Sequence, residues 1–243
     1  MQTLISGATT LEIPLSRQQV EQFRVFAALL GEWNQKMNLT AITDSVEVQK
    51  KHFLDCLVGM PLVAEELGAA LPPRRALACV DVGTGAGFPG VPLKIAWPSL
   101  KLTLVDGTAK KIRFLDEVVK ALALENVTLV QGRAEELGRN RRFRGQFDLA
   151  AARAVARLNT LTEYVLPFVR QGGLAVIYKG PNAAEEFMEA RNAIELLGGE
   201  TVRFSPVSVP MLDEERRVLL IKKLRKTPRQ YPRQQGLPRK EPL

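Results

Sequence analysis

The sequence predicts an α/β fold with a mostly parallel seven-stranded sheet, helices on both faces, an antiparallel hairpin at its C-terminal edge and a helical extension at its N-terminus. Strand-like and helix-like apolar segments alternate through most of the region 76–224, which is typical of right-handed βαβ units. The last two strand-like segments are joined by a connection too short for a helix, so we expect them to pair antiparallel. A length of 243 residues with 46% apolar residues is ample for a packed core.

Residues 1–75 are predicted to form helices that pack on the core. Ser16 is a candidate N-cap for a helix whose apolar residues recur three and four positions apart. Asp44 or Ser45 is a candidate N-cap for a second helix. A break rich in Gly, Pro and Arg at 68–75 then separates this extension from the first strand.

The region 76–224 is predicted to be the core, and 225–243 a basic tail. Strands are expected at 77–82, 101–106, 126–131, 146–151, 173–178, 200–207 and 216–224. Helices are expected at 89–97, at 109–123, in a short turn after 133, at 158–167 and at 183–197.

A glycine-rich loop follows the first strand, with an acid, Asp81, at the strand end and glycines at Gly83, Gly85 and Gly87. Glycine lets the backbone approach a ligand closely, so this loop predicts a site for a nucleotide-type cofactor. A dinucleotide fingerprint would need glycine at the position of Phe88. The spacing Asp-x-Gly-x-Gly-x-Gly instead resembles the first motif of class I S-adenosylmethionine (AdoMet) methyltransferases, whose cofactor has no pyrophosphate.

The ends of the following strands supply further candidates, because ligands of such sheets bind outside the carboxyl ends of the strands. They are, in chain order, Asp106, Gly107, Thr108, Ala134, Glu135, Arg153 and Lys179. A carboxylate at Asp106 could accept hydrogen bonds from both ribose hydroxyls. Glu135 also suits a helix N-terminus, Lys179 could be an ordinary solvated strand end, and Arg153 could form a structural salt bridge to Asp81 or Glu135.

A net charge of +8 predicts a polyanionic partner. The basic residues are concentrated in a cluster near residue 140 and in the tail, whereas charge that served solubility alone could be spread evenly. We expect RNA phosphates to contact arginines from both stretches, namely Arg139, Arg141, Arg142, Arg144, Arg229 and Arg233.

No metal site, disulfide or membrane segment is expected. His52, three positions before Asp55, is the only histidine, and its simplest interpretation is a surface or helix-face residue. Cys56 and Cys79 lie in apolar contexts without a Cys-x-x-Cys pair, which favours a reducing compartment. No targeting segment precedes the first helix. We therefore expect a cytoplasmic monomer, and the roles of His52 and Asp55 stay open.

Several stretches together resemble the bacterial 16S ribosomal RNA guanine-N7 methyltransferases, also called the glucose-inhibited division protein B family. They are residues 38–40, 52–55, 81–90, 132–135, 153–156, 179–180 and 231–233. The resemblance implies methyl transfer from AdoMet to N7 of a guanine, conventionally guanine 527, in 16S ribosomal RNA or a precursor of the small subunit. It also implies cofactor contacts at Gly83, Phe88, Ala134, Glu135 and Arg153, with Asp106 to Thr108 beside the ribose. Two departures, Cys56 and Gly107 where many members have Ser, put only side-chain contacts in doubt.

The residues also suit N7 as the target atom. Enzymes that methylate an exocyclic adenine amine resemble one another in an Asn/Asp-Pro-Pro-Tyr/Phe motif, whereas here that place, 151–154, reads Ala-Ala-Arg-Ala. Methylation of pyrimidine C5 needs a cysteine nucleophile in a site loop. Guanine N7 has a free in-plane lone pair, so alignment suffices, and Arg153 and Lys179 are the candidates for positioning phosphate or guanine O6. A small-molecule methyltransferase and a non-catalytic RNA-binding protein are the two alternatives.

Overall fold

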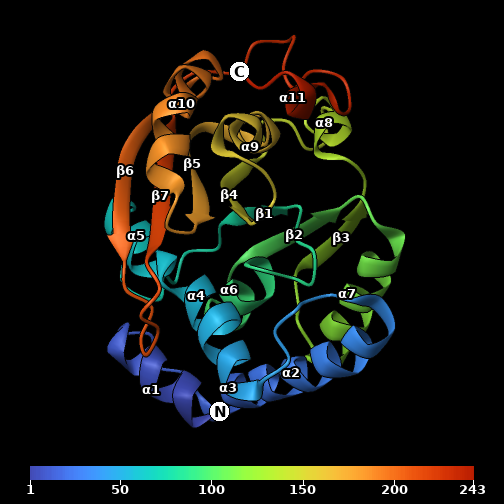
Figure 1. The fold of residues 1–243 in the computed structure, drawn as a ribbon, viewed down its shortest axis with the longest axis vertical. Helices are drawn as coiled ribbons and strands as arrows, with labels where there is room; N and C mark the ends of the chain where they lie inside the picture. The colour runs from blue at the N-terminus through green and yellow to red at the C-terminus, as the bar shows by residue number, and fades with distance from the viewer.

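The computed structural model describes residues 1–243 and is built around one sheet (Figure 1). The sheet has seven strands in the order β3-β2-β1-β4-β5-β7-β6. Strands β1 to β5 are parallel, and β7 is antiparallel to both β5 and β6. Their bounds are β1 (Ala78–Val82), β2 (Lys101–Asp106), β3 (Val127–Gln131), β4 (Phe147–Arg153), β5 (Val169–Lys179), β6 (Gly199–Val207) and β7 (Arg216–Lys223). The predicted sheet and its antiparallel C-terminal hairpin are confirmed.

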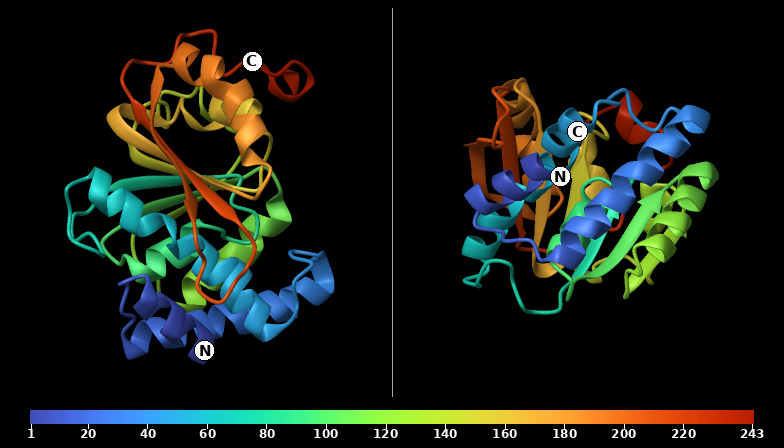
Figure 2. Two further views of the ribbon diagram at one scale, coloured as in Figure 1. Left: turned by 60° about the vertical axis from the view of Figure 1, so that its left-hand side comes forward. Right: turned by 90° about the horizontal axis from the view of Figure 1, so that it is seen from below.

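Helices cover both faces of the sheet, as Figure 2 shows. One face packs against the N-terminal helices, α6 (Gly90–Ala96) and α7 (Ala109–Ala121). The other packs against α8 (Ala134–Leu137), α9 (Leu158–Val165) and α10 (Ala183–Leu196). None of the helices is both long and apolar enough to span a bilayer.

The central strands divide their side chains between the two cores because successive residues of a strand point to opposite faces. In β4, Leu149 and Ala151 belong to the core on the side of the N-terminal helices, whereas Ala150 and Ala152 belong to the other core. All four are buried. The strands therefore read as continuous apolar runs, as expected for a sheet that is covered on both sides.

The N-terminal extension contains α1 (Gln2–Thr10), α2 (Arg17–Met37), α3 (Ser45–Val48), the π-helical segment η1 (Gln49–Leu54), α4 (Asp55–Leu57) and α5 (Gly59–Glu66). Ser16 caps α2 as predicted, in a reciprocal capping box with Gln19. Of the two candidates for the next cap, Asp44 is the one used, since its carboxylate accepts hydrogen bonds from the backbone of Val46 and Glu47.

Helix α1 was not predicted from the sequence. Its segment is rich in Thr and Ser and contains a glycine, all of which lower helix propensity. Tertiary packing stabilises it instead, because Leu4 and Ala8 are fully buried one turn apart. Gly7 lies against Leu54 so closely that a Cβ would come within 2.4 Å of that side chain.

The basic tail wraps over α8 and α9 and ends in a short helix, α11 (Leu237–Lys240) (Figure 1). Thr227, Tyr231 and Pro238 are buried against the core. Lys223, at the end of β7, donates hydrogen bonds to backbone carbonyls in the same region, and its burial lowers its pKa to about 7. The tail is thus an integral layer of the fold.

Candidate active site

The loop after β1 contains three glycines with positive φ, and they differ in what surrounds them. A Cβ at Gly85 would meet nothing closer than the Gly83 carbonyl oxygen, at 4.0 Å, so this backbone borders open space. A Cβ at Gly87 would come within 2.8 Å of Val91. Gly87 is therefore required by packing, and the backbone around Gly85 is the part of the loop that a ligand can approach.

Asp81 lies fully buried beneath this loop. Its Oδ2 accepts hydrogen bonds from the Thr84 hydroxyl at 2.6 Å and the Gly90 amide at 2.8 Å. Its Oδ1 has no partner. Burial raises the pKa of Asp81 to about 7, although these two hydrogen bonds oppose the shift. An unpaired buried carboxylate oxygen at a strand end indicates a position for a donor from a ligand.

Asp106, at the end of β2, joins two loops. Its Oδ2 accepts a hydrogen bond from the Gly85 amide at 3.0 Å, and its Oδ1 accepts one from the Thr108 amide at 2.8 Å. Gly107 lies between Asp106 and Thr108 in the chain, and a Cβ at this position would come within 3.0 Å of the Arg133 side chain. Lys111 Nζ also lies 3.5 Å from Asp106 Oδ2. A carboxylate has about four acceptor sites, so Asp106 retains some acceptor capacity for ligand hydroxyls.

Phe88 connects the glycine loop with the N-terminal extension. Its ring is buried and stacks on His52, with a centroid separation of 4.6 Å. The rings of Phe26 and Phe53 complete the cluster, with centroids 5.4 and 6.3 Å from that of Phe88. The Arg153 guanidinium lies 5.0 Å from the centroid of the Phe88 ring. The Phe88 side chain thus positions the loop against η1.

Arg153, at the end of β4, contacts η1 at two points and the first residue of α4 at a third. It donates hydrogen bonds to the Asp55 carboxylate at 2.5 Å, the Lys51 carbonyl at 2.9 Å and Nδ1 of His52 at 3.0 Å. Its ion-pair partner is therefore Asp55, and neither Asp81 nor Glu135, the partners considered from the sequence, fills that role.

His52 is buried, so its interpretation as a surface residue was wrong. A guanidinium can only donate, so the Nδ1 that faces Arg153 must be unprotonated. The opposite nitrogen, Nε2, then donates to the Thr40 hydroxyl at 2.7 Å. Burial and the Arg153 charge lower the pKa of His52 to about 4, so the ring is neutral at pH 7.

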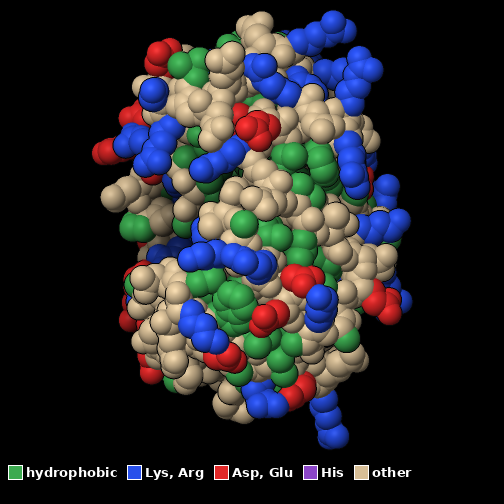
Figure 3. Space-filling model, turned by 90° about the vertical axis from the view of Figure 1, so that its right-hand side faces the viewer, with side chains coloured by type: hydrophobic (Ala, Val, Ile, Leu, Met, Phe, Trp, Pro, Cys, Tyr) green, Lys and Arg blue, Asp and Glu red, His purple; other side chains and the backbone are tan.

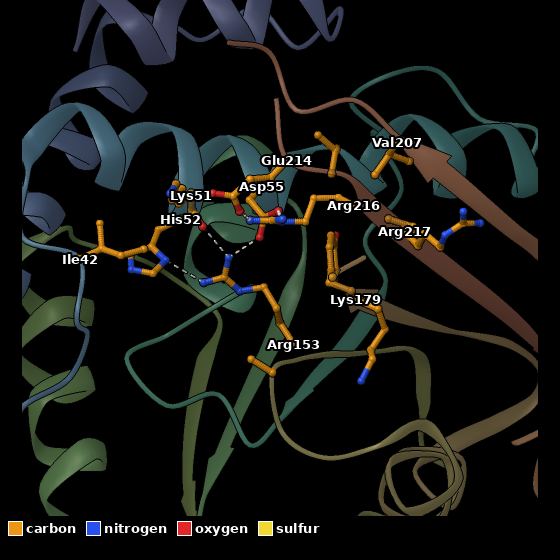
Figure 4. A pocket seen from close by; sticks show the side chains of 15 residues that line it. Ile42, Lys51, His52, Asp55, Arg153, Lys179, Val207, Glu214, Arg216 and Arg217 are labelled. Carbon is orange, nitrogen blue, oxygen red and sulfur yellow. Dashed lines mark hydrogen bonds and ion pairs between the residues drawn. The ribbon is translucent and has the colours of Figure 1, made fainter. Parts of the chain in front are cut away.

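A cavity of about 510 Å³ opens between η1, the ends of β4 and β5 and the start of β7 (Figure 4). Arg153 connects this cavity with the glycine loop, because it lines the cavity and also lies over the Phe88 ring. Five cationic side chains and two carboxylates line the cavity, namely Lys51, Arg153, Lys179, Arg216, Arg217, Asp55 and Glu214. Asp55 bridges Arg153 and Arg216, and Glu214 bridges Arg216 and Lys51.

The side chains of Lys179 and Arg217 point away from the group around Arg153 in Figure 4. Lys179 forms an ion pair with Glu186 at 2.6 Å and donates a hydrogen bond to the Ala156 carbonyl at 3.2 Å. Arg217 lies over the Phe204 ring at 5.2 Å. Lys179 is thus held against α10, on the opposite side of the sheet from Asp55.

Ala134 and Glu135 open α8 next to the tail. Glu135 is buried, and its Oε1 accepts a hydrogen bond from the Gly236 amide at 3.1 Å. Glu135 also lies in the first turn of α8, where the helix dipole favours an acid. The tail therefore covers this side of the candidate site.

The arginines predicted to contact RNA fall into two groups. Arg139 and Arg144 donate hydrogen bonds to backbone carbonyls of the tail, and Arg233 forms an ion pair with the fully buried Glu163. The remaining three, Arg141, Arg142 and Arg229, are exposed. Figure 3 shows one face of the molecule, on which Lys and Arg side chains gather in the upper half.

Sequence reasoning did not identify Lys51, Glu214 and Arg216 as site residues. The available signal was the charged run Asp-Glu-Glu-Arg-Arg at 213–217, at the start of the last strand. Antiparallel pairing places this run beside the end of β5, where Lys179 pairs with Arg217. Topology, rather than a local motif, brings these charges to the site.

The family model and the curated relatives that match this chain describe the same kind of protein. Residues 19–219 match the family model for rRNA small subunit methyltransferase G, GidB. The ribosomal RNA small subunit methyltransferase G of Alkaliphilus metalliredigens is 45% identical over 243 residues, which cover 99% of this chain and 97% of the relative. The protein of the same name from Oceanobacillus iheyensis is 46% identical over 233 residues, with coverages of 95% and 94%.

A solved structure shares the fold at low sequence identity. The 16S rRNA (adenine(1408)-N(1))-methyltransferase from Catenulisporales acidiphilia superposes with a TM-score of 0.51 at 16% identity, covering 64% of this chain and 88% of that one. At this identity the likeness establishes the Rossmann-like methyltransferase fold alone.

Proposed function

The chain belongs to the GidB family of rRNA small subunit methyltransferases, and from this we propose that it transfers a methyl group from AdoMet to N7 of guanine 527 in 16S ribosomal RNA. The structural observation that carries the proposal is the open backbone at Gly85, which lies between two buried carboxylates, Asp81 and Asp106. A cationic cavity large enough for a nucleotide is lined by Arg153, whose guanidinium also lies over the Phe88 ring of this loop.

The residues around Gly85 fit AdoMet. The unpaired Oδ1 of Asp81 would accept a hydrogen bond from an ammonium group. The free acceptor capacity of Asp106 suits ribose hydroxyls. Ala134 and Glu135, which begin α8 at the end of β3, would border the adenine. When bound, AdoMet supplies an electrophilic methyl group on a sulfonium centre.

The protein's own contribution is to position the target base. Guanine N7 is unprotonated at neutral pH and needs no general base, so alignment of the reactants is the main catalytic task and can contribute about 7 kcal/mol or more. Arg153 suits this role because it connects the glycine loop with the cavity, fixed by Asp55 and neutral His52. Lys179, at the end of the neighbouring strand, pairs with Glu186 and points away from Arg153, so we assign the positioning role to Arg153 first.

The RNA partner is 16S ribosomal RNA or a precursor of the small subunit. We assign the phosphate contacts of the outer surface to Arg141, Arg142 and Arg229, because these side chains are exposed and, unlike the exposed Arg139, do not bond to the tail. Arg139, Arg144 and Arg233 instead hold the tail that carries Arg229. They contribute to RNA binding through the shape of that surface.

The decisive experiment is transfer of labelled methyl from AdoMet to protein-free 16S ribosomal RNA and, separately, to small subunits. The expected product is N7-methylguanosine at one position, mapped by chain cleavage at the modified base. Label at an exocyclic amine or a pyrimidine carbon, or absence of label from both substrates, would refute the proposal.

Asp106→Ala tests the cofactor site within the same assay. Loss of its hydrogen bonds should weaken AdoMet binding by roughly 1 to 3 kcal/mol, as measured by calorimetry. Asp116→Ala, which removes an exposed carboxylate on α7 that pairs with Lys120, is the matched control and should bind AdoMet like the wild type. Equal affinities of the two variants would remove Asp106 from the cofactor site.

A further inference from the structure

The cavity beside Arg153 contains an anion that the protein itself supplies. The Glu214 carboxylate lies 2.7 Å from Lys51 Nζ and 2.8 Å from an Arg216 guanidinium nitrogen. Glu214 precedes β7, in the connection from β6, and its side chain is 50% exposed, whereas the side chains of its two partners are 28% and 17% exposed. A half-exposed carboxylate is thus held at the cavity by two cations that are better buried than it is.

Asp55 orients the Arg216 side chain for its contact with Glu214. Its Nε donates a hydrogen bond to Asp55 Oδ1 at 3.0 Å, and the other Asp55 oxygen accepts one from Arg153. The Asp55 side chain is only 8% exposed. Asp55 thus fixes the guanidinium groups of both Arg153 and Arg216. The Arg216 nitrogen that contacts Glu214 therefore belongs to the same hydrogen-bond network that positions Arg153.

The cavity has walls of two kinds. Charged side chains line the part shared by η1 and β7, whereas Val58, Val207 and Val218 contribute apolar surface. Its volume of about 510 Å³ lies within the range of about 300 to 1,000 Å³ that is typical of small-molecule sites. An apolar wall beside paired cations suits a ligand with a flat ring and a phosphate.

We propose that Lys51 and Arg216 bind a phosphate of the target nucleotide, and that Glu214 occupies this phosphate site until RNA displaces it. The inference rests on the proposed function and identifies the part of the cavity that receives the RNA backbone. A backbone phosphodiester carries one negative charge on two non-bridging oxygens, as a carboxylate does, so it can accept the hydrogen bonds that Lys51 and Arg216 give to Glu214. Displaced Glu214 lies at the surface, where water can solvate it.

Two pairs of adjacent residues give matched variants. Lys50 and Lys51 are neighbours on η1 with similar side-chain exposure, 23% and 28%, but only Lys51 reaches Glu214. Glu214 and Glu215 are neighbours with exposures of 50% and 47%, and Glu215 pairs with Arg217 instead. Each pair allows the same change of charge to be made at the proposed phosphate site and away from it, because Arg217 lines the cavity but points away from the group around Arg153.

The primary measurement is equilibrium binding of a 16S ribosomal RNA transcript, as a function of salt, to the full-length protein. Lys51→Gln should weaken binding several-fold and reduce the salt slope by about 0.7, the value for one phosphate contact to a single strand. Glu214→Gln should tighten binding, because it removes the competing carboxylate. Lys50→Gln and Glu215→Gln should bind like the wild type.

A second measurement separates a nucleotide pocket from a general basic surface. Guanosine 5′-monophosphate should compete with the transcript better than guanosine does, and Lys51→Gln should remove that advantage. Binding of AdoMet to each variant, measured by calorimetry, controls for folding and should be unchanged.

The proposal is overturned if Lys51→Gln and Lys50→Gln bind RNA equally well, or if Glu214→Gln binds no more tightly than Glu215→Gln. The RNA-binding measurements do not depend on methyl transfer. A wild-type protein that binds RNA in this pattern but transfers no methyl group would therefore refute the proposed function and leave the phosphate site supported.

Discussion

Two carboxylates of this protein, Asp81 and Glu163, are both fully buried, yet their surroundings differ. Glu163 accepts hydrogen bonds from the backbone amide and the guanidinium of Arg233 on both of its oxygens. Asp81 has two donors on one oxygen and none on the other, and its pKa is raised to about 7. The first carboxylate is satisfied within the fold, and the second is not.

The difference indicates what each charge does. A buried ion pair with all its hydrogen bonds made fixes one segment on another, and here it fixes the tail on α9. A buried carboxylate that lacks a partner costs stability, and proteins keep such groups where a ligand completes them. Burial alone therefore does not distinguish a structural acid from a binding acid, whereas the count of its hydrogen-bond partners does.

The largest effect is expected when the Glu163 pairing is broken. Arg233→Ala would leave the Glu163 charge buried without its guanidinium, which should lower the free energy of unfolding by about 3 to 5 kcal/mol. Urea denaturation measures this change. Arg229→Ala, an exposed tail residue, is the control and should stay within about 0.5 kcal/mol of the wild type. Similar losses in the two variants would contradict a specific role for the buried pair.

A smaller effect is expected from protonation of Asp81. Its raised pKa means that the carboxyl is largely protonated below pH 7 in the absence of ligand. A cationic ligand group binds the ionised form, so AdoMet affinity should rise with pH and level off above about pH 7. Below the pKa the affinity should fall by up to about tenfold per pH unit. Calorimetry between pH 5.5 and pH 7.5, in buffers with different ionisation enthalpies, would also detect the released proton.

Asp81→Asn is the control for this pH dependence. The amide does not titrate, so affinity should be low and should no longer rise between pH 5.5 and pH 7.5. A pH profile in this variant that is as steep as in the wild type would assign the titration to another group. His52 is excluded as that group, because its pKa is already lowered to about 4.

The sequence predicted those parts of the site that depend on neighbouring residues. Asp81, Asp106 and the glycines follow from the pattern of strand, turn and strand end, and the structure places them together. The sheet and its C-terminal hairpin follow from the alternation of segments. These features are local, so periodicity and turn chemistry are sufficient to predict them.

The parts that were missed depend on residues far apart in the chain. Arg153 and Asp55 are 98 positions apart, and Asp55 and Arg216 are 161 apart. Their meeting requires η1 and the start of α4 to lie across the end of β4 and the start of β7, which no local pattern reveals. The same holds for Glu163, whose partner Arg233 lies 70 positions away in a tail whose composition predicted contacts with RNA phosphates.

The smallest effect is expected for an exposed arginine of the cluster near residue 140. Arg142 is exposed and lies beside the Phe143 ring, whereas Arg144 donates hydrogen bonds to the carbonyls of Gly138, Thr227 and Tyr231. Arg142→Gln should therefore leave the free energy of unfolding within about 0.5 kcal/mol of the wild type. It should reduce the salt slope of RNA binding by about 0.7, with only a modest loss of affinity.

Arg144→Gln provides the contrast, because two positions away the same change of charge removes hydrogen bonds that anchor the tail. It should lower stability by about 1.5 to 3 kcal/mol, the value for hydrogen bonds from a charged group. Filter binding over a salt series and urea denaturation measure the two quantities on the same samples. If Arg142→Gln lowered the free energy of unfolding and left the salt slope of RNA binding unchanged, the exposed guanidinium of Arg142 would stabilise the fold. The number of hydrogen-bond partners would then fail to distinguish structural charges from binding charges at the surface.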